Sequence, residues 1–281
     1  MPFIIYVKSS EKAARECAPC KLFLVTSFLR TFCAQSYLPI VLTRARLPQG
    51  RSLANLGTTF MFFFPLFDEN STSRRPLIVW VVITTCIIVF FWQQSLDEIP
   101  ARLALYQLGF VPTIVFQGDT LPTKLILVPA WTTIITSMFL HGGWLHLGGN
   151  MLYLWIFGDN VEDAMGRVRF ILFYLLCGIA AALAQTAINP SSSIPMVGAS
   201  GGIAGVLGAY LILHPKAAVR CLLIIIVFFR FINLPAWLVL GGWIGLQFAA
   251  APQAFESNGS GVAYMAHIGG FVAGGTLISF F

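Results

Sequence analysis

The sequence predicts an all-α polytopic membrane protein, a bundle of six transmembrane helices. Hydrophobic residues make up 57% of the chain and the mean hydropathy is +0.81, whereas apolar residues are about half of a soluble domain. Only 10% of the residues are charged, against roughly a quarter in soluble proteins. Such a chain cannot cover a water-exposed surface with polar groups, so we expect it to lie in a lipid bilayer. The spans should be helices, because alternating barrel strands are absent.

Residues 1–60 form a basic segment that precedes the expected six-helix domain, residues 61–281. They hold eight Lys or Arg and two Glu, whereas residues 61–281 are balanced in charge. A charge excess confined to one segment does not indicate a nucleic-acid partner. Two interpretations stay open: a processed basic leader, or a chain whose true start is Met61, which we favour. Cys17-Ala-Pro-Cys20 has no second cysteine pair, which disfavours a redox or metal role.

Six apolar stretches are near the ~20 residues needed to cross the hydrocarbon core. They lie at about 77–93, 144–159, 168–188, 199–214, 234–250 and 262–281. The second and fourth are short, which suits helices buried within a bundle. The apolar stretch 221–232 is broken by Arg230, so we expect it to be an interfacial approach to the fifth span.

The loop charges predict the orientation, because Lys and Arg gather on the cytoplasmic side of a membrane protein. Seven of them share one side: Arg74, Arg75, Arg167, Arg169, Lys216, Arg220 and Arg230. The opposite side has only Arg102 and Lys124. We therefore expect a cytoplasmic amino terminus, in a bacterial inner membrane.

Ser200 and His267 are polar residues in apolar spans, where each polar side chain needs a reason to be present. A serine is a weak nucleophile until a base takes its proton, and histidine suits that task. Under the predicted topology both residues lie at comparable depth, just below the outer surface. Glycines at small-xxx-small spacing would let their two helices approach closely; they are Gly201, Gly205 and Gly208 on the fourth span, and Gly270 and Gly274 on the sixth.

Acyl transfer also needs hydrogen-bond donors for the developing oxyanion. His146 and Asn150 are four residues apart at the start of the second span and so share a helical face. For His141 we favour a structural, hydrogen-bonded role. The third to sixth spans contain no Asp or Glu, which predicts a Ser–His dyad without an acidic member. A metal site is disfavoured because no carboxylate or cysteine joins the histidines at ligand spacing, and we expect no cofactor.

These elements together resemble the rhomboid family of intramembrane serine proteases, from Met61 to Phe281. The motifs that carry the resemblance are His141-x4-His146-x3-Asn150, Phe157-Gly-Asp-Asn-Val-Glu162, Gly198-Ala-Ser200-Gly201 and Ala266-His267-x2-Gly270-x3-Gly274. Although Gly198-Ala-Ser-Gly-Gly202 also matches the nucleophile elbow of α/β hydrolases, that motif needs a preceding strand and an α/β core, which the sequence does not predict.

The resemblance implies that Ser200 is the nucleophile and His267 the general base, with His146, Asn150 and the Ser200 backbone N–H as oxyanion donors. It implies substrates that are transmembrane segments of other proteins, cut near the outer face. It also implies a membrane-dipped loop at about 95–140 and a cap at about 251–261. Some family members stack an aromatic side chain on the histidine from one turn after the serine, where this chain has Ala204. The alternative function is that of the family's inactive relatives, which bind membrane proteins in quality control. The sequence predicts no oligomeric state.

Overall fold

The computed structural model describes residues 3–5, 61–119, 121–225, 228–256 and 262–281. Most of the basic segment lies outside the described residues, including Cys17 and Cys20. Part of the expected cap, residues 257–261, lies outside them as well. The chain divides into two compact units. The first comprises residues 65–221 and 233–281 and holds all of the described helices, while the second comprises residues 2–64 and 222–232.

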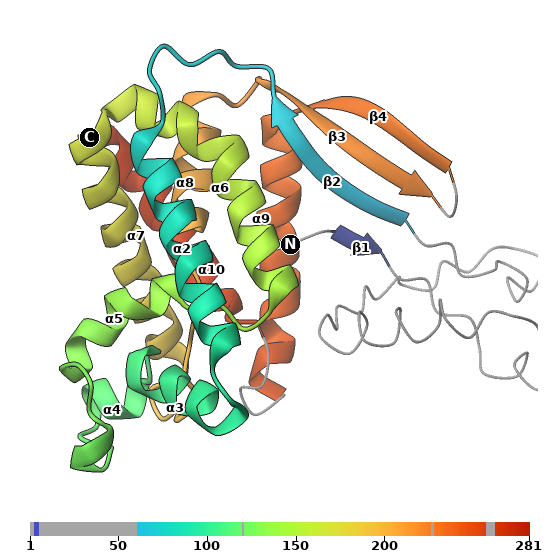
Figure 1. Ribbon diagram of the computed structural model, residues 1–281. Coiled ribbons are helices and arrows are strands. Elements are labelled where there is room, and N and C mark those ends of the chain that lie inside the picture. The colour runs from blue at the N-terminus through green and yellow to red at the C-terminus, as the bar shows by residue number, and fades with distance from the viewer. Residues whose placement is uncertain (1–2, 6–60, 120, 226–227, 257–261) are drawn as a thin grey trace, which may run out of the picture. The chain divides into compact units, whose positions relative to one another are not determined.

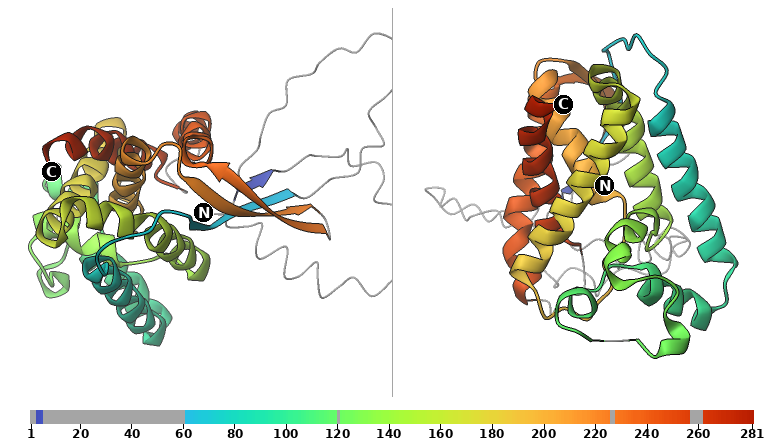
Figure 2. Two further views of the ribbon diagram at one scale, coloured as in Figure 1. Left: turned by 90° about the horizontal axis from the view of Figure 1, so that it is seen from above. Right: turned by 90° about the vertical axis from the view of Figure 1, so that its left-hand side faces the viewer.

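The first unit is a helical bundle (Figure 1). Its long helices are α2 (Leu77–Ser95), α6 (Trp144–Met165), α7 (Arg167–Ile188), α8 (Ser200–Leu213), α9 (Ala236–Glu256) and α10 (Tyr264–Leu277), the last followed by the 3-10 turn η5 (Ile278–Phe280). Short helices fill the connection between α2 and α6: α3 (Glu98–Leu108), α4 (Pro112–Phe116), η2 (Thr123–Leu125), η3 (Ala130–Thr132), α5 (Thr133–Thr136) and η4 (Ser137–Phe139). Figure 2 shows α3, α4 and α5 gathered at one end of the bundle.

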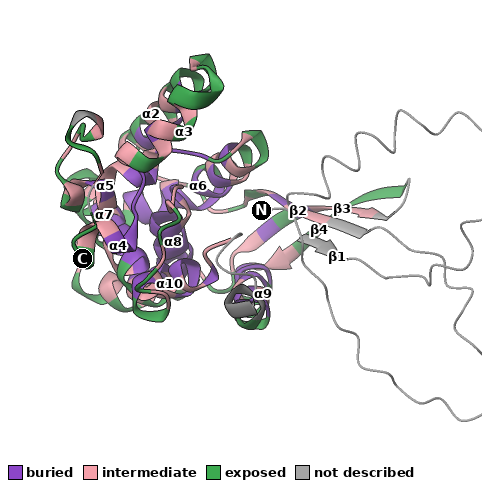
Figure 3. Ribbon diagram, turned by 90° about the horizontal axis from the view of Figure 1, so that it is seen from below, coloured by how far each residue is buried: buried purple, intermediate pink, exposed green. Residues whose placement is uncertain are grey.

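Helix α8 is the core of the bundle. It packs against α6, α7, α9 and α10, and every residue from Gly201 to Tyr210 is buried (Figure 3). Its 14 residues correspond to about 21 Å of helix, which is shorter than the hydrocarbon core of a bilayer. A helix that is covered by other helices does not have to match the lipid thickness, because its neighbours meet the lipid instead.

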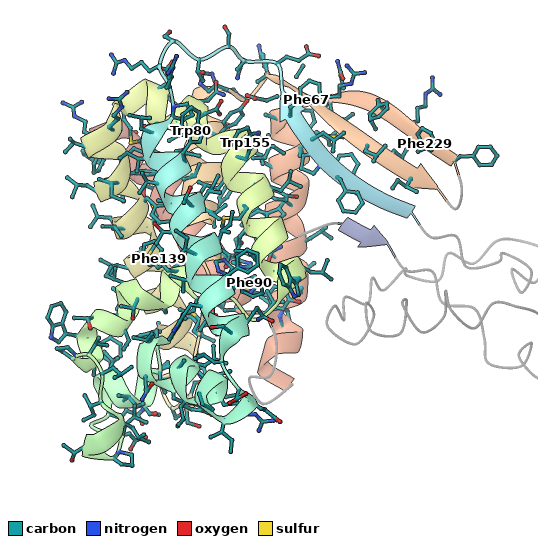
Figure 4. The ribbon with its side chains drawn as sticks, in the orientation of Figure 1. Phe67, Trp80, Phe90, Phe139, Trp155 and Phe229 are labelled. Carbon is teal, nitrogen blue, oxygen red and sulfur yellow. The ribbon has the colours of Figure 1, made fainter. Side chains whose placement is uncertain are left out.

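Two of the described helices, α2 and α7, are long and apolar enough to cross a membrane by themselves. Shorter apolar segments occur in α8, α9 and α10. The outward faces of α2 and α6 carry Trp80 and Trp155 (Figure 4), which are 39% and 58% exposed. Large exposed aromatic side chains are expected where a helix faces lipid.

Carboxylates at the end of α6 hold the start of α2. Glu162 is buried and accepts hydrogen bonds from the backbone N–H groups of Ile78 and Val79 at 3.1 and 2.9 Å. Asp163 accepts one from the N–H of Ser73 at 2.7 Å. The first N–H groups of a helix have no intrahelical acceptor, and negative charge is favourable there. These two acids therefore bind backbone groups and take no part in the site described below.

The chain also forms a four-stranded sheet in the order β1-β2-β3-β4. The strands are β1 (Phe3–Ile5), β2 (Met61–Asp68), β3 (Ala218–Ile225) and β4 (Phe228–Pro235), and β1 pairs antiparallel with β2. The described residues are mostly helical, as predicted, but the all-α prediction is wrong for residues 218–225 and 228–235, which form β3 and β4. The stretch 218–235 is rich in β-branched and aromatic residues, which are common in strands. A strand also needs a partner, and the pairing of β3 with the distant β2 is not visible in the sequence.

Candidate active site

Ser200 is the first residue of α8, and the backbone before it has a conformation that requires glycine. Gly198 has φ +129°, which side-chain-bearing residues rarely adopt. A Cβ atom at this position would also lie 2.7 Å from Cε1 of His146. The N–H of Gly198 donates to the carbonyl of Ser137 at 2.9 Å. The glycine thus lets the chain turn into α8 directly beside the His146 ring.

Ser200 and His267 are brought together from two different helices. Nε2 of His267 lies 2.8 Å from Oγ of Ser200, although 67 residues separate them in the sequence. His267 is only 2% exposed. A serine hydroxyl at this distance from an imidazole nitrogen can pass its proton to it, which is the geometry that nucleophile activation requires.

Glycines bring α8 and α10 close enough for this contact. Gly270 lies against the carbonyl of Gly201, and Gly274 lies one turn further along against the carbonyl of Gly205. Gly208 meets α10 at the backbone of Phe271 and Gly275. The two glycine rows that the sequence placed on facing helices are therefore in contact, and neither row has room for a side chain.

The other ring nitrogen of His267 contacts an amide rather than an acid. Nδ1 lies 2.8 Å from Oε1 of Gln247, which is buried on α9. The ring of Trp243, one turn earlier on α9, has its centroid 5.7 Å from the His267 centroid. Neither residue was predicted from the sequence, because the expected partner of the histidine was a carboxylate or an aromatic side chain at position 204. A lone glutamine in an apolar span, four residues after a tryptophan, was the available signal.

His146 and Asn150 lie on α6 beside the loop that carries Gly198. A Cβ on Gly198 would be 2.8 Å from Nε2 of His146 and 3.7 Å from Nδ2 of Asn150. Nδ1 of His146 accepts a hydrogen bond from the N–H of Gly142 at 3.3 Å, so the neutral ring has its proton on Nε2. Among the described residues, the buried Nδ2 of Asn150 has no hydrogen-bond partner. Two side-chain donors therefore lie near the residues that lead into Ser200.

His141 is buried, and the structural role that the sequence predicts for it stays a prediction. Its ring is buried beside that of His146, with 5.3 Å between the centroids. The backbone of Phe139 also lies beside the ring. The backbone of His141 is held by Gln93: the His141 N–H donates to Oε1 of Gln93 at 3.0 Å, and the His141 carbonyl accepts from Nε2 of the same amide at 3.3 Å.

The model of the rhomboid domain matches residues 129–281, more than half of the chain. The chain belongs to the rhomboid family. This match confirms the resemblance inferred from the motifs, and it includes Ser200, His267, Gln247, His146 and Asn150. The family consists of integral membrane proteins and includes intramembrane serine proteases, so the protein is a membrane protein of that family.

Relatives of this rhomboid protein are found in a bacterium, a yeast and a plant. It is 34% identical over 201 residues to "Rhomboid protease GluP" of Bacillus subtilis, covering 67% of this chain and 37% of the relative. It is 31% identical over 228 residues to "Rhomboid protein 1, mitochondrial" of Saccharomyces cerevisiae, covering 78% of this chain and 57% of the relative. A third relative, "Rhomboid-like protein 11, chloroplastic" of Arabidopsis thaliana, is 39% identical over 77 residues, which are 27% of each chain. The matched regions thus cover less than two thirds of each relative.

Proposed function

We propose that this rhomboid-family protein is an intramembrane serine endopeptidase that cleaves transmembrane segments of other membrane proteins. The observation that carries the proposal is the 2.8 Å contact between Oγ of Ser200 and Nε2 of His267. In this proposal Ser200 is the nucleophile and His267 the general base, so that the two residues form a catalytic dyad.

The reaction then proceeds by acyl transfer. The Ser200 proton moves to Nε2 of His267 while Oγ bonds to the carbonyl carbon of the scissile peptide. The imidazolium next gives that proton to the leaving nitrogen, and the C–N bond breaks to leave an acyl-enzyme. A water molecule attacks the ester, its proton passes to Nε2, and the proton returns to Oγ as the acid product leaves. The steps consume one water and use only protein groups.

His146, Asn150 and the backbone N–H of Ser200 are the proposed oxyanion donors. Support comes from the proton on Nε2 of His146, from the unpartnered Nδ2 of Asn150, and from the closeness of both atoms to Gly198. The Ser200 N–H belongs to the first turn of a helix, where amides have no intrahelical acceptor. Donors fixed in place before the reaction stabilise the developing charge without reorganising.

The proposed topology has six spans, formed by α2, α6, α7, α8, α9 and α10, with a cytoplasmic amino terminus. The Lys and Arg asymmetry of the loops supports this orientation. Helices α6, α8 and α10 then begin on the outer side, and Ser200 and His267 lie in the first turns of α8 and α10. Cleavage is therefore expected near the outer face.

The test is cleavage of a transmembrane substrate by the purified protein in liposomes, next to the Ser200→Ala and His267→Ala variants. Matched controls replace the same residue types elsewhere: Ser193→Ala in an exposed loop and His214→Ala at the far end of α8. The two dyad variants should be inactive and the two controls active. A serine-directed fluorophosphonate should label the wild type but not Ser200→Ala. Cleavage that survives in Ser200→Ala would refute the proposal.

A further inference from the structure

Gln247 is a buried polar residue within an apolar helix, and its side chain contacts the proposed base. It is 6% exposed, and its Oε1 lies 2.8 Å from Nδ1 of His267, the ring nitrogen that faces away from Ser200. A buried amide is costly unless it is hydrogen-bonded. This contact satisfies the amide oxygen and at the same time constrains the imidazole.

The orientation of the amide is set by its own helix. Nε2 of Gln247 donates to the carbonyl oxygen of Trp243, four residues earlier, at 3.5 Å. Turning the amide over would place its oxygen against that carbonyl, where two acceptors would repel each other. Oε1 therefore faces His267. Because an amide oxygen only accepts hydrogen bonds, Nδ1 of His267 must be the donor and must carry the proton of the neutral ring.

A neutral imidazole with its proton on Nδ1 has a free lone pair on Nε2, the atom beside Ser200. We propose that Gln247 is a positioning residue that holds His267 in the tautomer able to accept the serine proton. This inference rests on the proposed dyad. Trp243 lies on α9, like Gln247, and is 6% exposed. Its ring centroid lies 5.7 Å from that of the His267 imidazole, so the indole restricts rotation of the imidazole. One turn of α9 therefore orients the base both by a hydrogen bond and by packing.

An amide suits this position better than a carboxylate does. His267 and Gln247 are 2% and 6% exposed, and an ionised carboxylate in such surroundings loses its hydration. Gln247 selects the tautomer without placing a charge there. The imidazolium that forms during the reaction consequently gains no opposite charge from this contact, and a glutamate at position 247 would supply one.

The experiment measures kcat and KM across a pH series in proteoliposomes with a transmembrane substrate. Gln247→Leu removes the acceptor while keeping the size of the side chain. It should lower kcat by roughly 10²-fold, the loss that a misplacement of about 1 Å at a catalytic group can cause, with KM unchanged. Gln247→Glu keeps an acceptor oxygen, so it should recover most of the activity and move the acidic limb of the pH–rate profile to higher pH.

The matched control is Gln185→Leu. Oε1 of Gln185 accepts a hydrogen bond from the backbone N–H of Ala266 at 3.2 Å, so this amide holds the start of α10 through the backbone. The pH–rate profile of the Gln185→Leu variant should keep the wild-type shape. Melting temperatures of all variants separate loss of folding from loss of function, and Gln247→Glu provides a variant of the same size if Gln247→Leu does not fold.

Two results would overturn the inference: Gln247→Leu with kcat within twofold of the wild type, or Gln247→Glu with an unmoved profile. Failure of the dyad itself gives a different pattern, because Ser200→Ala would then still cleave. If Ser200→Ala is inactive while Gln247→Leu is fully active, only the role of Gln247 is wrong.

Discussion

Gly270 on α10 lies directly against the carbonyl oxygen of Gly201 on α8, and a Cβ atom on Gly270 would collide with that oxygen. Ser200 precedes Gly201 by one residue, and His267 precedes Gly270 by three. The contact between these two glycines therefore sets the separation of the two helices at the point where Oγ and Nε2 meet. A backbone oxygen cannot move aside as a flexible side chain can. The short distance between the helices therefore requires a glycine, which has no side chain, at position 270.

Replacing Gly270 with alanine should disrupt the site by pushing α10 away from α8. Overpacking of a tight core typically costs about 1–3 kcal/mol, and a misplacement of about 1 Å can cost roughly 10²-fold in rate. We expect Gly270→Ala to lower both the melting temperature and kcat in the liposome assay. The control is Gly245→Ala on α9, where a Cβ would meet nothing within 4 Å; it should cleave at the wild-type rate. A fully active Gly270→Ala protein would contradict this account of the helix contact.

Asn150→Ala should lower kcat by roughly 10²–10³-fold, the range seen when one oxyanion donor is removed, with little change in KM. The reason is that Nδ2 of Asn150 is buried without a partner among the described residues, so its hydrogen bond forms only as the oxyanion develops. Steady-state kinetics on the transmembrane substrate would measure the effect. Asn189→Ala, at the end of α7, serves as the control. A rise in KM with unchanged kcat would mean that Asn150 binds substrate instead.

Gly198→Ala should abolish cleavage, because the added methyl group combines backbone strain with a collision against the His146 ring. The two causes can be separated with Gly118, which has φ +80° but nothing within 4 Å of a Cβ. Gly118→Ala carries the strain alone, about 1–2 kcal/mol, and should retain activity. The measurement is the cleavage rate together with the melting temperature of each variant. Equal losses in both variants would show that the contact with His146 is unimportant.

Asp68, outside the membrane-spanning helices, makes stability depend on pH. Burial raises the pKa of its carboxyl above the usual value, and the charge of nearby Asp159 adds to the rise, while hydrogen bonding from Tyr210 and the charge of His214 oppose it. The folded state thus binds this proton more tightly than the unfolded state does. Its stabilising effect is fully present below the unfolded value of 3.8 and is lost as the pH rises through the folded pKa.

The variant Asp68→Asn has no titratable carboxyl at this position, so it tests whether the Asp68 proton stabilises the folded protein at low pH. Lowering the pH from neutrality toward 4 should raise the melting temperature of the wild type relative to Asp68→Asn, measured in the same detergent. The assignment fails if the gap between the wild type and Asp68→Asn widens in the opposite direction.

The candidate site could be predicted in part from single residues. Ser200 and His267 stand out because polar side chains interrupt apolar stretches, and this is visible without any contact information. The glycine rows of α8 and α10 are also visible, since their spacing repeats with the helical turn. Gln247 breaks an apolar stretch in the same way, but whether its amide faces lipid, another helix or an imidazole depends on how α9 is rotated against α10. No property of α9 by itself sets that rotation.

Composition and local motifs are enough to identify an integral membrane protein of the rhomboid family, because both can be read along the chain. Which atoms meet depends on the packing of the helices: Nε2 of His267 meets Ser200, Nδ1 of His267 meets Gln247, and the His146 ring meets Gly198. The same holds for strands β3 (218–225) and β4 (228–235), where the apolar sequence predicts only an interfacial approach to the fifth span. The physical reason is the same in each case. These features depend on backbone pairing and on close packing between segments far apart in the chain. Neither can be predicted from the local periodicity of the sequence.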